Sequence, residues 1–116
     1  MGEGEDDRIE FIHTLASLSK PPDFVPLNAL IPIKGTPLED KPHISFWEMV
    51  RVIATLKIAI PRAIIRFAGG RSHFSKEEQT VFFIAGVGGV HVGEKHLTAK
   101  NCSLKEDKKF FQLLGV

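Results

Sequence analysis

The stretch Ala-Ile-Ile-Arg-Phe-Ala-Gly-Gly at residues 63–70 decides the fold. Its first six residues are mostly apolar and predict a short strand over 63–68, and the two glycines then end the strand in a turn. The interior of this strand holds one charged residue, Arg66. A guanidinium cannot shed its charge, so its burial requires a partner such as a carboxylate, an anion or a metal-bound ligand. The stretch therefore predicts a buried strand with one residue of chemical interest.

A helix is predicted on each side of this strand in the sequence. Residues 46–59 place apolar side chains at helical spacing, and Ser45 forms a capping box with Glu48 three residues on. Residues 75–86 begin with a serine cap and two glutamates, and they end at a glycine. The strand over 63–68 therefore lies between two helices.

The same alternation continues outward to both ends of the chain. We expect a helix over 5–19, a strand over 24–33, a strand over 89–93, a polar loop over 94–103 and a docking helix over 104–114. Strands that alternate with helices predict a parallel sheet, with functional loops after the carboxyl ends of the strands. Three strands are few, and the chain starts with the helix of a strand-helix unit, so the pattern indicates a piece of a larger α/β protein.

Length and composition restrict the class of protein further. The chain has 116 residues, a length that predicts a single domain, or part of one, over residues 1–116. Its formal net charge is +1, so no overall electrostatic field favours binding to nucleic acid or to an anionic membrane. The longest stretch without Asp, Glu, Lys or Arg, residues 79–93, is shorter than a membrane span. Residues 1–7 lack the apolar core of a signal peptide. With one cysteine, Cys102, the sequence predicts an intracellular protein without an internal disulfide.

The sequence gives little support to three other kinds of site: a dinucleotide-binding loop, a zinc site and a cysteine nucleophile. The glycines within residues 86–89 leave a helix and enter a strand, the reverse of a dinucleotide-binding loop, so close backbone packing explains them better. The histidines form no pair at metal-ligand spacing with a third ligand nearby. Cys102 and His96 lie in a polar loop without an orienting carboxylate or an oxyanion hole. We therefore favour neither a dinucleotide, a zinc nor a thiol-nucleophile site.

Two polar residues in apolar strands remain as candidates. For Arg66, a structural ion pair and a ligand role are both open. Asn28 is the one polar residue of the predicted strand over 24–33, and its amide is either a satisfied core group or a ligand contact. Spacing alone does not separate these alternatives.

Six short motifs carry a resemblance to a known family. They are VPLNAL (25–30), KGTPL (34–38), RFAGGR (66–71), AG (85–86), GEK (93–95) and QLLG (112–115). With these motifs in register from residue 2 to the last residue, the chain resembles the C-terminal part of biotin synthase. The resemblance implies an α/β fold that is the C-terminal part of a TIM (β/α)8 barrel. It would comprise the helix after the fifth strand and then the sixth, seventh and eighth strand-helix units.

The resemblance also implies a chemistry. Biotin synthase is a radical S-adenosylmethionine enzyme that inserts sulfur into dethiobiotin, and it holds a 4Fe-4S and a 2Fe-2S cluster. The position of Arg66 corresponds to an arginine ligand of the 2Fe-2S cluster that supplies the sulfur. Asn28 corresponds to a residue that contacts dethiobiotin, and Ile31 corresponds to one near the adenosine part of S-adenosylmethionine. Asn28 and Ile31 both fall on the sixth strand of the implied barrel.

The chain departs from the family pattern in two respects. The CxxxCxxC motif and the other cysteines that hold the clusters are absent, and Cys102 is not one of them. The family usually has Ser-Ala-Gly-Arg where this chain has Ala-Gly-Gly-Arg at 68–71, and Asn-Ser where this chain has Gly-Gly at 88–89. These changes remove small polar side chains near the implied cluster site.

We therefore expect a C-terminal fragment of biotin synthase that is inactive, and binds no cofactor, on its own. The parent enzyme is expected in the cytoplasm or in mitochondria, with no nucleic-acid or membrane partner, and a homodimeric parent is left open. The competing hypothesis is a non-enzymatic, degenerate half-barrel that folds only with a partner. A third is a small ligand-binding domain that uses the carboxyl edge of the sheet.

Overall fold

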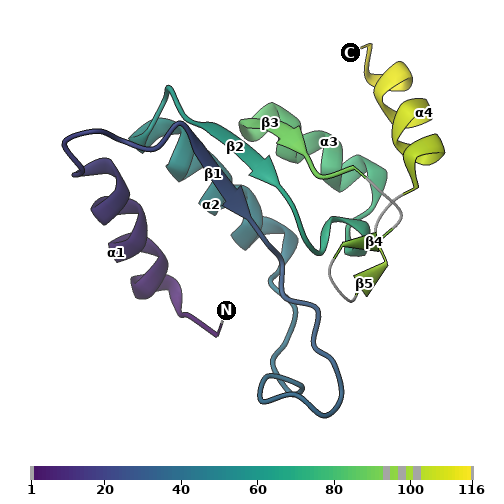
Figure 1. The fold of residues 1–116 in the computed structure, drawn as a ribbon, viewed down its shortest axis with the longest axis horizontal. Helices are drawn as coiled ribbons and strands as arrows, with labels where there is room; N and C mark the ends of the chain where they lie inside the picture. Colours follow the sequence, from purple (N-terminus) through teal and green to yellow (C-terminus); the bar gives the residue numbers. More distant parts are fainter. Residues whose placement is uncertain (1, 93–94, 97–98, 101–102, 116) are drawn as a thin grey trace.

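The computed structural model describes residues 2–92, 95–96, 99–100 and 103–115 and shows an α/β arrangement (Figure 1). In chain order, the elements are α1 (Glu5–Ala16), β1 (Phe24–Leu27), α2 (Phe46–Ala59), β2 (Ile64–Phe67), the short 3-10 helix η1 (Arg71–His73), α3 (Lys76–Ala85), β3 (Val87–Val90), β4 (Lys95–His96), β5 (Ala99–Lys100) and α4 (Leu104–Leu114). Among these described elements, no helix has both the length and the apolar character needed to cross a membrane.

The main sheet has the strand order β1-β2-β3, and both pairs of neighbouring strands are parallel. Its middle strand is β2, in which Arg66 lies opposite Pro26 of β1 and opposite Gly89 of β3. A separate antiparallel pair is formed by β4 and β5. The predicted parallel sheet with alternating helices is confirmed, and Arg66 lies in its middle strand.

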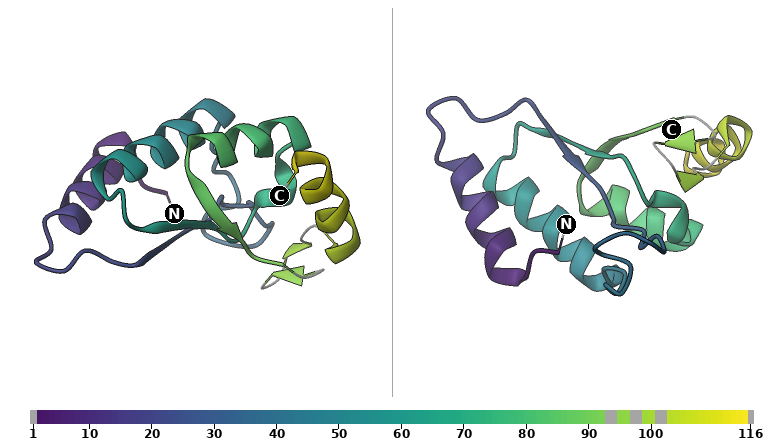
Figure 2. Two further views of the ribbon diagram at one scale, coloured as in Figure 1. Left: turned by 90° about the horizontal axis from the view of Figure 1, so that it is seen from above. Right: turned by 60° about the horizontal axis from the view of Figure 1, so that its bottom comes forward.

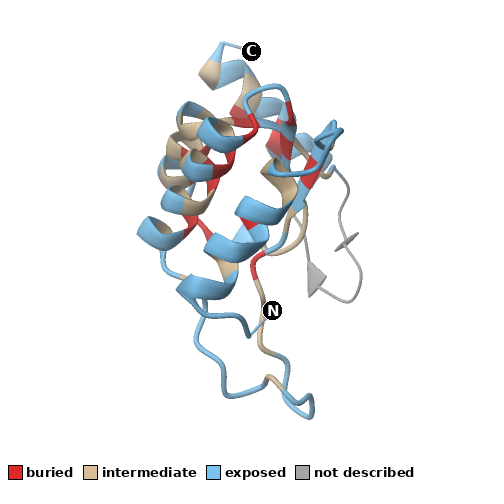
Figure 3. Cartoon of the chain, turned by 90° about the vertical axis from the view of Figure 1, so that its left-hand side faces the viewer, coloured by how far each residue is buried: buried red, intermediate tan, exposed pale blue. Residues whose placement is uncertain are grey.

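Within the described ranges, helices cover one face of this sheet and leave the other face open. Figure 2 shows α1, α2 and α3 on the same side of the three strands. Along β2, Ile65 and Phe67 are buried against the helices, whereas Ile64 and Arg66 are exposed on the other face. Figure 3 shows the buried residues gathered between the helices and the sheet. This open, one-sided sheet matches a segment of a TIM barrel, whose strands turn their other face to the barrel interior.

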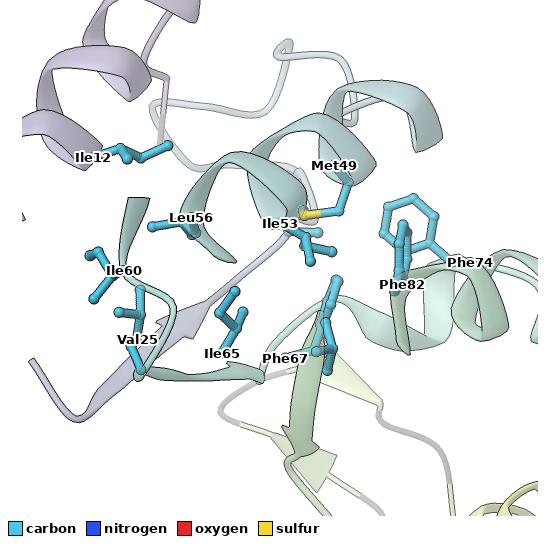
Figure 4. Packing of buried hydrophobic residues seen from close by; sticks show 13 residues of the cluster. Ile12, Val25, Met49, Ile53, Leu56, Ile60, Ile65, Phe67, Phe74 and Phe82 are labelled. Carbon is cyan, nitrogen blue, oxygen red and sulfur yellow. The ribbon is translucent and has the colours of Figure 1, made fainter. Parts of the chain in front are cut away.

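The hydrophobic core lies between α2 and the sheet (Figure 4). Ile53 and Leu56 of α2 are 0% and 1% exposed, and they belong to the same cluster as Val25 and Ile65. An aromatic group continues the core toward α3: Phe67, Phe74 and Phe82. Full burial of one such side chain stabilises a fold by about 1.5–3 kcal/mol. The core therefore holds α2 and α3 firmly on the covered face.

Serine caps begin three of the helices. At the start of α2, the Ser45 hydroxyl accepts a hydrogen bond from the Glu48 N–H at 3.2 Å, and the Glu48 carboxylate accepts one from the Ser45 N–H at 3.1 Å. The bond from the Ser45 backbone N–H, more than any other contact, lowers the pKa of Glu48. The same arrangement at Ser75 and Ser103 begins α3 and α4. The predicted capping box and the predicted helix over 46–59 are both confirmed.

Strand β1 is shorter than predicted, because it ends at Leu27 whereas the sequence predicted a strand over 24–33. Its partner β2 ends at Phe67, and the Ala68 N–H donates the next backbone hydrogen bond to the Leu27 carbonyl. The neighbouring chain then turns through two glycines. Residues 28–33 therefore lack a strand with which to continue the ladder.

Other boundaries differ for equally local reasons. Helix α1 ends at Ala16, three residues before the predicted end, and the Ser17 hydroxyl bonds back to a carbonyl of its last turn. Strand β3 covers Val87–Val90 instead of 89–93, because it begins directly after the glycine that ends α3. The predicted polar loop over 94–103 contains β4 and β5, whose two-residue strands are too short to show a periodic pattern.

Candidate functional site

The side chain of Arg66 lies on the uncovered face of the sheet. It is exposed, and its guanidinium carbon lies 5.2 Å from the centre of the Phe24 ring. Its neighbours on the adjacent strands are Pro26 and Gly89, and a Cβ added to Gly89 would lie 3.8 Å from Arg66 Nε. Because neither neighbour has a long side chain, the guanidinium is accessible from the open side of the sheet.

No described element of this chain buries the side chain of Arg66. The strand alternates between its two faces, and Arg66 falls with Ile64 on the face that has no helices. Among the described residues, no carboxylate forms an ion pair with Arg66. The described residues therefore contain no acidic partner for the structural ion pair that was one of the two interpretations of Arg66.

Asn28 follows the carboxyl end of β1 and is exposed, so the described part of this chain does not enclose its amide in a core. Its Oδ1 accepts a hydrogen bond of 2.8 Å from the Gly69 N–H. One residue on, the Ala29 N–H donates a bond of 2.9 Å to the Gly69 carbonyl. None of the described residues accepts a hydrogen bond from Asn28 Nδ2. The amide is therefore anchored through its oxygen and has its NH2 group available to a ligand.

The turn that holds Asn28 requires glycine at its second position. Gly70 has φ +81°, and a Cβ there would lie 2.2 Å from the carbonyl oxygen of Ala29. Real side chains do not tolerate such a separation from backbone. The pair Gly69–Gly70 therefore lies directly against Asn28 and Ala29, and the two chain segments fix each other.

The structure places the three expected site residues on neighbouring segments of the chain. Arg66 of β2 lies opposite Pro26 of β1, and Asn28 is the first residue after the end of β1. Ile31 is half-buried in the segment that leaves the carboxyl end of β1. In parallel α/β sheets and barrels, this end of the strands is where binding sites form.

A buried ion pair joins the short helix η1, which follows β2, to the C-terminal helix α4. Arg71 of η1 and Asp107 of α4 are 1% and 2% exposed. Nη1 donates to Asp107 Oδ1 at 2.9 Å and Nη2 donates to Oδ2 at 2.8 Å, which is a two-pronged contact. Arg71 also donates to Gln79 Oε1 at 3.0 Å and to the His91 carbonyl at 3.3 Å. One guanidinium therefore joins η1 to α3, to α4 and to the segment after β3.

Sequence reasoning missed this pair, although one signal for it was present. Asp107 precedes Phe110 and Phe111 by three and four residues, so an acid lies on the apolar stripe of the predicted docking helix. A carboxylate on a buried stripe calls for a cationic partner. Nothing local in the sequence identifies that partner as Arg71, which is 36 residues away.

A groove of ≈380 Å³ lies between β1 and the helices α1 and α2. Its apolar wall includes Phe11 and Ile12 of α1, Leu27 of β1 and Met49 of α2, and Asn28 also lines it. The groove therefore opens beside one of the expected site residues, at the edge of the sheet where β1 has no second neighbour among the described strands.

Histidines lie near the same edge without forming a metal centre. The rings of His43 and His73 stack with their centroids 3.7 Å apart and 13° between their planes. Nitrogens of parallel rings lie in separate planes and do not converge on one ion. In the described ranges, no group of three His, Cys, Asp or Glu residues could hold a metal ion. Cys102 and the side chain of His96 lie outside the described residues.

The sequence matches the family described as Biotin and Thiamin Synthesis associated domain over residues 26–116. Over 116 residues it is 47% identical to the biotin synthase of Cytophaga hutchinsonii, matching 100% of this chain and 34% of that protein. The mitochondrial biotin synthase of Arabidopsis thaliana is 46% identical over 116 residues, 100% of this chain and 31% of that protein. That of Emericella nidulans is 44% identical over 115 residues, 99% of this chain and 29% of that protein. The chain thus spans about a third of the length of these curated relatives.

Proposed function

The chain belongs to the Biotin and Thiamin Synthesis associated domain family, and from this membership we propose that it is the C-terminal portion of a working biotin synthase. In this proposal, residues 1–116 form one partial domain that completes a (β/α)8 barrel with strands from the rest of the enzyme. The whole enzyme is a sulfurtransferase that inserts sulfur into dethiobiotin to give biotin by radical S-adenosylmethionine chemistry.

One observation carries the proposal, namely the position of Arg66. Its guanidinium lies on the uncovered face of the middle strand, and no described carboxylate pairs with it. In a closed barrel this face points inward, where an unpaired guanidinium is costly unless an anionic or metal-bound group meets it. We therefore assign Arg66 as a ligand of the 2Fe-2S cluster, as the family resemblance implies.

The residues of this chain fit one ligand position and not a complete cluster site. Thiolates are the usual ligands of iron-sulfur clusters, and the sequence has one cysteine. The thiolates for both clusters therefore come from outside this chain, and the chain alone is inactive and without cofactor in this proposal. When bound, the 2Fe-2S cluster supplies the sulfur atom, while the 4Fe-4S cluster and S-adenosylmethionine supply the radical chemistry.

We assign the other two site residues to the small molecules. Asn28 has an anchored Oδ1 and an available Nδ2, so its amide can donate a hydrogen bond to a polar group of dethiobiotin. Ile31 is half-buried and apolar, which suits contact with the adenosine part of S-adenosylmethionine. Ala68, Gly88 and Gly89 stand where the family usually has polar residues, so these positions donate no side-chain hydrogen bonds to the cluster.

The same exposed sheet face is also what a non-enzymatic half-barrel with a partner would present. The two hypotheses differ in what they require of Arg66, because only the enzyme needs a guanidinium at that position. We propose an intracellular enzyme, cytoplasmic or mitochondrial, that acts on a small molecule and uses neither nucleic acid nor a membrane. A homodimeric parent enzyme is compatible with this proposal.

The test is an enzyme in which this chain replaces the matching C-terminal third of the Cytophaga hutchinsonii relative, called here the joined enzyme. We expect the joined enzyme, with its clusters reconstituted, to form biotin from dethiobiotin, and Arg66→Met to abolish or strongly reduce this. The matched control is Arg62→Met, which removes an exposed arginine just before β2 and should leave the rate unchanged. A folded, cluster-loaded joined enzyme that makes no biotin would contradict the proposal.

A further inference from the structure

We infer that Arg71 and Asp107 are positioning residues, which set the geometry of the Asn28 amide through the Gly69–Gly70 turn. The inference rests on the proposed function, in which Asn28 contacts dethiobiotin. Neither member of the pair touches that substrate in our account. Their effect reaches Asn28 through three short steps of contact.

The first step is the fixed position of the Arg71 side chain. Asp107 engages both ends of the guanidinium, at 2.9 and 2.8 Å, and the two residues are almost fully buried. A planar guanidinium held by a two-pronged carboxylate has little freedom to rotate. Helix α4 therefore determines where the arginine lies.

The second step is the fixed position of the Arg71 backbone. Gln79 Nε2 donates to the Arg71 carbonyl at 3.3 Å and to the Phe74 carbonyl at 2.9 Å, while its Oε1 accepts from the guanidinium. The His91 carbonyl, in the segment after β3, accepts a further bond of 3.3 Å from the guanidinium. Side chain and main chain of this arginine are thus both attached to elements that flank the sheet.

The third step leads from Arg71 to Asn28. Gly70 directly precedes Arg71 and packs on Ala29 so closely that no Cβ fits between them. Gly69 exchanges two hydrogen bonds with the opposite segment, donating to Asn28 Oδ1 and accepting from the Ala29 N–H. If the position of Arg71 were no longer fixed, the Gly69–Gly70 turn could move, and the Gly69 N–H that binds Asn28 Oδ1 would move with it. The orientation of the available Nδ2 therefore depends on the buried pair.

The experiment is a double-mutant cycle on dethiobiotin affinity in the joined enzyme. Asp107→Asn keeps the shape of the carboxylate and removes its charge, and it should weaken dethiobiotin binding about tenfold by loosening the turn. In an Asn28→Ala background, the same change should alter the Kd by less than about twofold, because the residue through which it acts is gone. The control is Asp40→Asn, an exposed aspartate in the segment after β1.

A second measurement does not depend on activity or on loaded clusters. Hydrogen exchange of the segment over residues 67–72 should be faster in Asp107→Asn than in the parent and in Asp40→Asn. Should Asp107→Asn fail to fold, Arg71→Lys serves in both measurements, because it keeps the positive charge and loses the two-pronged contact.

The outcomes separate this inference from the proposed function. If Asn28→Ala alone leaves the Kd unchanged, the proposed contact with dethiobiotin is wrong, and the inference falls with it. If Asn28→Ala weakens binding while Asp107→Asn leaves both the Kd and the exchange unchanged, the proposed function stands and the positioning role is overturned. The positioning role would also be overturned if Asp107→Asn weakened dethiobiotin binding by the same factor with and without Asn28→Ala, because the two effects would then be independent.

Discussion

The carboxylate of Asp107 in α4 accepts two hydrogen bonds, of 2.9 and 2.8 Å, from the guanidinium of Arg71, which lies 36 residues earlier in the chain. Both side chains are almost completely buried. This contact ties the C-terminal helix to the turn after the middle strand. It also has a direct consequence for stability.

Arg71→Met is expected to destabilise the fold by about 3–5 kcal/mol, because it leaves a buried carboxylate without its cationic partner. Urea unfolding of the joined enzyme measures this change. The matched control is Arg62→Met, since that arginine is exposed and its loss should change stability by less than about 0.5 kcal/mol. Equal unfolding midpoints for the two variants would show that the pair does not stabilise the fold.

Gly70→Ala tests the close contact between the turn and Ala29. Gly70 and Gly35 have nearly the same backbone angle, with φ of +81° and +85°, but only Gly70 has a neighbour that a Cβ would meet. Gly35→Ala should therefore cost about 1–2 kcal/mol, for the left-handed conformation alone. Gly70→Ala should cost about 1–3 kcal/mol more, because backbone must also move. Unfolding curves that coincide for the two variants would refute the contact.

Glu48 provides a pH-dependent contribution to stability. Its pKa is lowered from 4.5, chiefly because its carboxylate accepts the Ser45 backbone N–H. A lowered folded-state pKa means that the contribution is present above the unfolded-state value and disappears as the pH falls through the folded-state value. Glu48→Ala should thus reduce the unfolding midpoint at pH 7, and this difference should shrink below about pH 4.5. A difference that stays constant from pH 7 to pH 3 would exclude this mechanism.

The isolated chain is expected to self-associate. Its parallel sheet has two open edges among the described strands and one uncovered face, on which Phe24, Ile64 and Arg66 are exposed. Unpaired strand edges and exposed apolar patches promote association. Size exclusion with near-ultraviolet circular dichroism measures this. A sharp monomer peak together with cooperative melting would contradict the expectation.

Much of the fold follows from local pattern. Helix α2 begins and ends as predicted, because a capping box precedes its apolar spacing and a proline follows it. The end of β1 was not predictable from its apolar run, because that run continues beyond Leu27 while the partner strand turns away at Gly69 and Gly70. Strand length here depends on a neighbour some 40 residues along the chain, as the Asn28 contact with Gly69 illustrates.

The candidate site was predictable in part for the same reason. Arg66 is a polar residue within an apolar strand and Asn28 one within an apolar run, so the sequence alone was enough to select them as candidates. Their exposure was not predictable, because it depends on which face of the sheet the helices cover. The pairing of Arg71 with Asp107 joins distant segments, and the sequence shows only that an acid lies on an apolar stripe.

The most direct test of the central claim, that Arg66 serves the 2Fe-2S cluster, is a paired measurement on Arg66→Met in the joined enzyme. Thermal melting reports on the fold, and electronic absorption with Mössbauer spectra reports on the cluster. Our account predicts a melting temperature close to that of the parent together with a changed cluster spectrum or lifetime, because ligand identity and local charge set those properties. An unchanged cluster spectrum accompanied by a large fall in melting temperature would contradict it.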